Sequence, residues 1–331
     1  MSSWLLGAGT LFSQKGIGGL LGPIFDRAIE VNLGIHPGIR SRGHQLVMVS
    51  DFGGRNKAQS YQTYAFLTFD LDKNIRWLHG QRLFRLTGLQ RRRMSFKTMN
   101  DAYRRRALVP FLQLADTIIG WLVIFAVPRR GGTLFQSSIE TLSTERALLN
   151  IWKPEVQEEL LRILHFSSFL LSGLSAPRQD VLWIIDEDEV AANAGQLVRL
   201  TDLLGQISSH YLGHDLGNLR CATTRSDDGT MSFEDAAAIP DLVAGAFSEI
   251  ATAMTAQGLL PVSKVAAPLP NNLSWKSRVL ATWLASDTGS LRSLQRLNYI
   301  MRVEKGSPGI GVTALKWHAL PGRMLMPYQR G

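Results

Sequence analysis

Short apolar runs of strand length, separated by segments with helical periodicity, constrain the fold of this chain most. Residues 46–51 and 61–69 are rich in apolar residues, and the short connection between them predicts an antiparallel hairpin. A weaker third strand is predicted at 74–84. We expect further strands at 117–127, 180–186 and 218–224, and helices at 99–116, 136–150, 154–172, 189–211 and 233–256. This order predicts an α/β fold in which helices cover both faces of a mixed sheet.

Length and composition indicate three parts. The chain has 331 residues, of which 45% are hydrophobic, so it can bury a substantial core. We expect a core domain at 45–257, an apolar, glycine-rich arm at 1–44 and an extension at 258–331 that packs on the core. The arm lacks the basic leader of a signal peptide, and we interpret it as a segment that packs on the body or on a protein partner.

The charge balance favours an anionic partner. Lys and Arg exceed Asp and Glu by 36 to 27, a net charge of +9, which is typical of proteins that bind nucleic acid. Cys221 is the single cysteine, so the sequence excludes an internal disulfide and fits a cytoplasmic location. The most apolar stretch, 117–127, is too short to cross a bilayer, and we expect no membrane association.

Two familiar motifs are excluded. Asp51, Phe52 and Gly53 spell the metal-binding triplet of protein kinases, but only 50 residues precede Asp51 and the chain has no His-Arg-Asp. His210 and His214 have the spacing of zinc ligands on a helix, but the sequence lacks His-Glu-x-x-His. The Walker loop and the Gly-x-Ser-x-Gly motif are absent as well.

Acidic residues stand where predicted strands end. Asp51 ends the first strand, and Asp186 ends a buried strand and opens a run of four acids. Asp241 follows Pro240 within an apolar helix. Sites in α/β proteins assemble at the ends of central strands, and carboxylates suit Mg²⁺ or Mn²⁺. The local alternatives are a turn residue at Asp51, a helix cap with first-turn acids at Asp186, and a cap at Asp241 where Pro240 breaks the helix.

The order of strands and acids resembles the ribonuclease H-like fold, and more closely an uncharacterised prokaryotic family within it. Typical members open with Asp-Glu-Ser-Gly on the first strand, carry an aspartate after a later strand, and close with Ala-Asp-Leu-x-Ala-Gly on the last core helix. The corresponding segments here are SDFGG at 50–54, VLWIIDED at 181–188 and PDLVAG at 240–245. The resemblance spans about residues 45–255.

The resemblance implies a metal-dependent nuclease, in a context of bacterial defence or mobile elements. Relatives gather acids around two divalent metals, one of which activates water while the other stabilises the leaving oxygen of a phosphodiester. Carried over to this sequence, the catalytic and metal-binding residues are Asp51, Asp186 and Asp241, with Asp188 as a fourth candidate. The implied cofactor is Mg²⁺ or Mn²⁺.

This chain departs from the family pattern at Phe52, which replaces the acid beside the first aspartate. Asp101 and Glu145 are candidates to compensate, while Asp116 mimics the third motif but falls too early in the chain. The departure keeps an alternative open: a catalytically inactive ribonuclease H-like subunit that docks nucleic acid or protein partners.

A basic segment predicts the nucleic-acid surface. Arginine triplets at 91–93 and 104–106 flank Lys97, and such residues make phosphate contacts, although a solvated helix face is the alternative. We expect Lys97 to face the acidic cluster. The residues predicted to bind nucleic acid are Arg91, Arg92, Arg93, Lys97, Arg104 and Arg105.

Overall fold

The computed structural model describes residues 43–130, 134, 148–186, 189–260, 269–285, 293–303 and 310–315. Most of the expected arm, nearly all of the expected helix at 136–150, and Asp188 lie outside the described residues.

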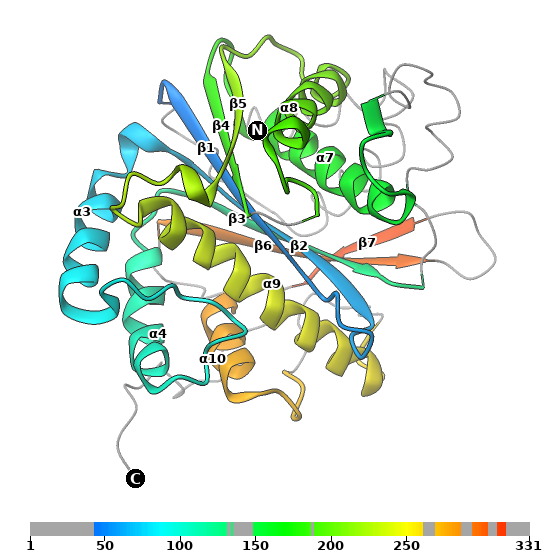
Figure 1. Cartoon of the computed structure of the whole chain (residues 1–331). Coiled ribbons are helices and arrows are strands. Elements are labelled where there is room, and N and C mark those ends of the chain that lie inside the picture. The colour runs from blue at the N-terminus through cyan, green and yellow to red at the C-terminus, as the bar shows by residue number, and fades with distance from the viewer. Residues whose placement is uncertain are drawn as a thin grey trace.

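The described residues form one mixed sheet of seven strands in the order β5-β4-β1-β2-β3-β6-β7 (Figure 1). Strands β1, β2 and β3 form an antiparallel meander, while β4 and β5 run parallel to β1 on its other side. On the far edge, β6 is parallel to β3 and β7 is antiparallel to β6. The strands are β1 Gln45–Gly53, β2 Tyr61–Asp70, β3 Gly120–Pro128, β4 Asp180–Ile185, β5 Leu219–Thr223, β6 Leu294–Val303 and β7 Ile310–Ala314.

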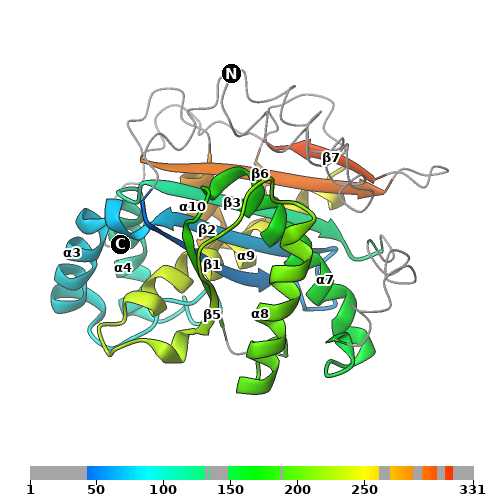
Figure 2. The same cartoon turned by 90° about the horizontal axis from the view of Figure 1, so that it is seen from above.

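Helices cover both faces of the sheet, as the sequence predicted (Figures 1 and 2). One face packs against α7 and α8, and we call this the α7–α8 core. The other packs against α3, α4, α9 and α10, and we call this the α9 core. The helices are α3 Ile75–Phe84, which continues into a π-helical turn at Arg85–Leu89, α4 Ala102–Ala115, α7 Pro154–Leu174, α8 Ala194–Ser209, α9 Ser232–Ala256 and α10 Trp275–Leu284.

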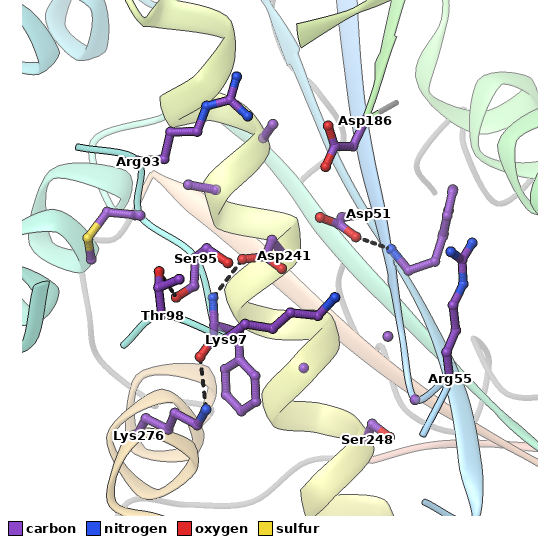
Figure 3. Close-up of a pocket in the computed structure, with 18 of the residues that line it drawn as sticks. Asp51, Arg55, Arg93, Ser95, Lys97, Thr98, Asp186, Asp241, Ser248 and Lys276 are labelled. Carbon is purple, nitrogen blue, oxygen red and sulfur yellow. Dashed lines mark hydrogen bonds between the residues drawn. The ribbon is translucent and has the colours of Figure 1, made fainter. Parts of the chain in front are cut away.

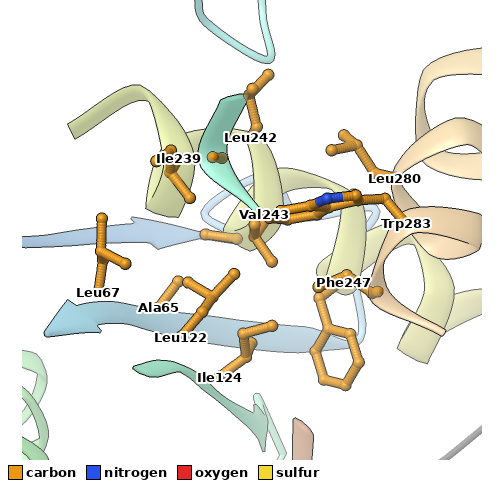
Figure 4. Packing of buried hydrophobic residues seen from close by; sticks show 14 of the residues in the cluster. Ala65, Leu67, Leu122, Ile124, Ile239, Leu242, Val243, Phe247, Leu280 and Trp283 are labelled. Carbon is orange, nitrogen blue, oxygen red and sulfur yellow. The ribbon is translucent and has the colours of Figure 1, made fainter. Parts of the chain in front are cut away.

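Helix α9 lies directly on the central strands, because small residues allow a close approach. A Cβ atom on Gly53 would lie 2.7 Å from the carbonyl of Ala244 in α9, and the Thr63 hydroxyl donates to that same carbonyl at 2.7 Å. Alongside this contact, Val243, Phe247 and other apolar side chains of α9 fill the space between helix and sheet (Figure 4). The helix is therefore fixed against the ends of β1 and β2.

One predicted strand is wrong. The predicted strand at 74–84 is instead Asn74 followed by α3, in which the buried residues Trp77 and Gln81 are four apart, the spacing of one helix face. Asn74 supports the preceding turn, since its amide donates to the Asp70 carbonyl at 2.8 Å and its carbonyl oxygen accepts from the Ile119 amide at 2.8 Å. The contact with Ile119 joins residues 45 positions apart in the sequence, and local patterning did not reveal it.

The extension contributes strands that the sequence did not predict. Strand β6 pairs with β3 from Gly120 opposite Leu294 to Ala126 opposite Ile300. Helix α10 adds Trp283, which is fully buried in the α9 core. Strands β6 and β7 therefore enlarge the same sheet that carries β1 and β4.

Candidate functional site

Asp51 and Asp186 come from neighbouring parallel strands in matching register. Ser50 of β1 pairs with Ile185 of β4, and the residues that follow them along the sequence are Asp51 and Asp186. Side chains alternate along a strand, and Val49 and Ile184 belong to the α9 core. Both aspartates therefore project to the α9 side, at the carboxyl ends of the two strands (Figure 3).

Asp241 reaches the same region from α9. The helix runs unbroken from Ser232 to Ala256 with Pro240 inside it, so the alternative of a cap at a helix break is wrong. The Asp241 carboxylate accepts a hydrogen bond from the backbone N–H of Phe96 at 2.7 Å. Burial, and then the negative charge of Asp186, raise the pKa of Asp241, while the Phe96 N–H, Ser95 and Lys97 act to lower it.

The three aspartates line one open cleft with a volume of about 860 Å³ (Figure 3). Its acids come from the sheet and α9, whereas its cations come from the surrounding loops, α4 and α10. The acidic residues are Asp51, Asp186, Glu234, Asp241 and Glu249, and the basic residues are Arg55, Arg93, Lys97, Arg104 and Lys276. An arrangement of this kind can hold a cation on one side and an anion on the other.

Half of the predicted basic residues line the cleft. Arg93, Lys97 and Arg104 lie on its wall, and the charge of Lys97 acts on Asp241. Arg91, Arg92 and Arg105 are exposed and are not among the residues that line it.

The loop that carries Arg93 and Lys97, residues 90–101, is anchored to α9 by buried acids. We call it the basic loop. Glu234 forms an ion pair with Arg93, and Asp235 forms one with Arg85. Arg85 also donates to the carbonyls of Gln90 and Arg92 at 2.8 and 2.7 Å. Burial raises the pKa of Asp235, while its hydrogen bond with Arg85 and the charge of that arginine act to lower it.

The ring of Phe52 lies on the other side of the sheet from the aspartates. It contacts Tyr64 and Phe66, with ring centroids 5.8 and 6.3 Å away, and packs against the α7–α8 core. Its backbone N–H donates to the Asp51 carboxylate at 2.5 Å. Because neighbouring strand residues face opposite ways, an acidic side chain at position 52 would project away from the three aspartates.

The acids considered as substitutes have other positions. Asp101 caps α4 and pairs with Arg104 at 2.8 Å and Arg92 at 3.7 Å. Asp116 forms an ion pair with Arg296 and accepts from the Trp283 indole at 3.0 Å. Glu145 lies outside the described residues.

Sequence reasoning missed Arg55, Glu234 and Lys276. Arg55 follows Gly53, the last residue of β1, and Gly54, and it pairs with Glu159 at 3.1 Å. Glu234 stands in the first turn of α9, where acids are common for local reasons. Lys276 comes from the extension and donates to the Phe96 carbonyl at 2.8 Å. Only the position of Arg55 beside Asp51 offered a signal.

Within the described part of the chain, no group of three or more His, Cys, Asp or Glu side chains is arranged so that it could already hold a metal ion. Asp188 stands outside that part. The donor set nevertheless fits a hard divalent cation in its chemistry. Mg²⁺ usually keeps several waters and is bound through one or two carboxylates plus a substrate phosphate.

Helix α9 is also long and apolar enough, by length and composition, to be considered as a membrane span. Its packing explains that composition, because 67% of the apolar window is buried inside the protein against the sheet and α10.

Comparison with known proteins found no family model that matches the chain and no match among curated proteins.

Proposed function

We propose that this chain is a divalent-metal-dependent nuclease with a ribonuclease H-like fold, which hydrolyses phosphodiester bonds of nucleic acid. One observation carries the proposal: Asp51 and Asp186 leave adjacent parallel strands in register, in a cleft that Asp241 also lines. A role in bacterial defence or mobile elements is an expectation of the family resemblance, and a cytoplasmic location is an expectation from the single cysteine.

The sheet supports the ribonuclease H-like part of the proposal. An antiparallel meander, β1 to β3, is followed by β4 and β5 added in parallel on the other side of β1. Strands β6 and β7 add to the edge at β3, far from the ends of β1 and β4.

The electrostatics of the cleft favour Mg²⁺ or Mn²⁺ as the cofactor. Burial, and then the charge of Asp186, raise the pKa of Asp241, and a bound cation would relieve the repulsion between these carboxylates. Asp51 and Asp186 are the residues that would hold the ion, with Asp241 facing them. When bound, the ion would supply Lewis-acid chemistry for phosphodiester hydrolysis.

The basic side of the cleft supports an anionic substrate. Arg93, Lys97 and Arg104 would contact phosphate oxygens next to the carboxylates. These residues would position the nucleic acid, so that the phosphodiester to be cleaved lies beside Asp51 and Asp186.

The test measures cleavage and metal binding in the same variants. Labelled DNA and RNA are incubated with Mg²⁺ or Mn²⁺, and Mn²⁺ binding is measured by calorimetry. We expect Asp51→Asn and Asp186→Asn each to lower the cleavage rate by about 100-fold and to weaken Mn²⁺ binding. Asp202→Asn, an exposed acid on α8, should change neither. Unchanged cleavage by the Asp51→Asn/Asp186→Asn double variant would rule out the nuclease site.

A catalytically inactive subunit is the second candidate. The hydrogen bond that Asp241 accepts from the Phe96 N–H of the basic loop favours an inactive subunit, because this acid already has a structural partner. A wild-type protein that binds nucleic acid but cleaves neither DNA nor RNA with either metal would support this candidate instead.

A further inference from the structure

Beside the cleft, cationic side chains lie over aromatic rings. The guanidinium carbon of Arg92 is 3.9 Å from the ring centroid of Tyr103, and that of Arg105 is 4.6 Å from the ring centroid of Trp275. We call these four residues the aromatic–basic surface. They come from the basic loop, α4 and α10, and the Arg105–Trp275 contact joins α4 to α10.

Two chains of contacts lead from the aromatic–basic surface into the cleft. Arg92 shares Asp101 with Arg104, which lines the cleft. Trp275 precedes Lys276, whose ammonium lies 3.8 Å from the ring centroid of Phe96. Lys276 and Phe96 both line the cleft. A nucleic-acid strand that extends from the carboxylates toward this side would therefore meet aromatic and cationic groups in alternation.

Arg92, Tyr103 and Arg105 are exposed, whereas Trp275 is half-buried against the α9 core, and both rings are firmly placed. Tyr103 is 58% exposed, and the Arg92 side chain is 45% exposed. Asp101 caps α4 by accepting from the Tyr103 N–H at 2.8 Å, which fixes the helix start that carries the ring. Ser274 caps α10 ahead of Trp275, and its hydroxyl donates to Glu249 of α9 at 2.7 Å. Both rings are therefore held by capped helix ends.

Cations alone would suffice to bind the backbone of a duplex, whose bases are stacked inside the helix. Aromatic rings and guanidinium planes gain most from bases that are unstacked and can lie on them. The alternation of rings with cations therefore favours a single strand, in which phosphates contact arginines while bases stack.

We infer that the aromatic–basic surface is a binding path for single-stranded nucleic acid, DNA or RNA, leading to the cleft. The inference deepens the proposed function and rests on it for the meaning of the cleft. The path prefers single strands over duplexes of the same sequence, and Tyr103 provides a stacking platform at its outer end.

The experiment measures binding apart from cleavage. Fluorescence anisotropy follows labelled DNA and RNA single strands of about 20 nucleotides, and the matching duplexes, in EDTA so that no metal-dependent cleavage occurs. We expect Tyr103→Ala to weaken single-strand binding by about 10-fold. Tyr103→Phe, which retains the ring, should bind like the wild type. Val198→Ala, an exposed apolar residue on α8, is the matched control and should have no effect.

Salt dependence separates the two kinds of contact. Arg92→Ala and Arg105→Ala should each reduce the slope of log affinity against log salt by about one. Tyr103→Ala should weaken binding but leave that slope unchanged, because stacking releases no counterion. Equal affinity for duplex and single strand would overturn the inference, as would wild-type binding by Tyr103→Ala.

The inference and the nuclease proposal can fail separately. A protein that cleaves nucleic acid, but binds single strands equally well with and without Tyr103, would overturn the path only. A protein that binds single strands through Tyr103, and cleaves nothing with Mg²⁺ or Mn²⁺, would overturn the nuclease and support the path.

Discussion

Gly245, a single residue of α9, determines how closely the basic loop can approach the helix. A Cβ atom at this position would lie 2.3 Å from Cδ1 and 2.4 Å from Cγ of Phe96. The Phe96 N–H donates to Asp241, one helical turn before Gly245, so ring and amide hold the loop at two points. Gly245 therefore has a physical role in shaping the cleft wall.

We expect Gly245→Ala to destabilise the protein by about 1–3 kcal/mol, because the loop has to move to accommodate the methyl group. The Asp241–Phe96 hydrogen bond should be lost with it. Urea unfolding gives the stability change, and amide hydrogen exchange at Phe96 reports the bond.

The matched control is Gly205→Ala in α8, where the nearest atom to a new Cβ is 3.8 Å away. Alanine has a higher helix propensity than glycine, so this variant should gain up to about 1 kcal/mol. Equal stability changes in the two variants would contradict the role given to Gly245.

At the scale of elements, the sequence predicted most strands and helices. It did not reveal the strands of the extension or the packing of helices against distant parts of the chain. Runs such as 46–51 and 180–186 are apolar because both faces of a central strand are buried, which makes them easy to recognise. Parallel pairing then makes the nearness of Asp51 and Asp186 predictable from strand ends alone. The placement of Glu234 and Lys276 was not predictable, since it depends on packing of α9 and α10 against distant parts of the chain.

Helix α7 meets α8 and the turn that follows it through buried polar pairs, one of which makes stability depend on pH. His165 Nδ1 and the Tyr211 hydroxyl share a hydrogen bond of 2.6 Å, and the Ser168 and Ser208 hydroxyls share one of 2.9 Å. Burial, and then the charge of His210, lower the pKa of His165 from 6.5 to about 3. The folded protein therefore binds a proton at His165 less readily than the unfolded chain does.

Because this folded-state pKa is depressed, the contribution of His165 to stability falls as pH drops below 6.5 and continues to fall to about pH 3. Between pH 7 and pH 5 we expect a loss of about 2 kcal/mol from this residue. Burial raises the pKa of Asp235 and Asp241, so these acids act in the opposite direction.

Comparing variants isolates the contribution of the histidine. His165→Gln, which stays neutral, should lose less stability than the wild type between pH 7 and pH 5, as measured by urea unfolding. His79→Gln, an exposed histidine on α3, serves as the control and should follow the wild type. Parallel pH profiles for wild type and His165→Gln would contradict the assignment.

At the scale of the whole molecule, one carboxylate joins the core to the extension. Asp116, directly after α4, forms an ion pair with Arg296 of β6 and accepts from Trp283 of α10. The Arg296 side chain is only 6% exposed, and burial lowers its pKa to about 9. The guanidinium also lies 4.0 Å from the Trp283 ring centroid and donates to the Trp283 carbonyl at 2.6 Å. The charge of Arg296 thus depends on Asp116 for its compensation.

We expect Asp116→Ala to destabilise the protein by about 3–5 kcal/mol, because it leaves a buried guanidinium without its counter-charge. The same change should increase amide hydrogen exchange in β6, since the strand would be held to β3 by backbone pairing without the ion pair. The double variant Asp116→Ala/Arg296→Met removes the uncompensated charge and should recover much of the lost stability. A double variant no more stable than Asp116→Ala would show that the carboxylate acts through the Trp283 hydrogen bond rather than through Arg296. Protection of β6 that stays at the wild-type level in Asp116→Ala would contradict the view that this ion pair fastens the extension to the sheet.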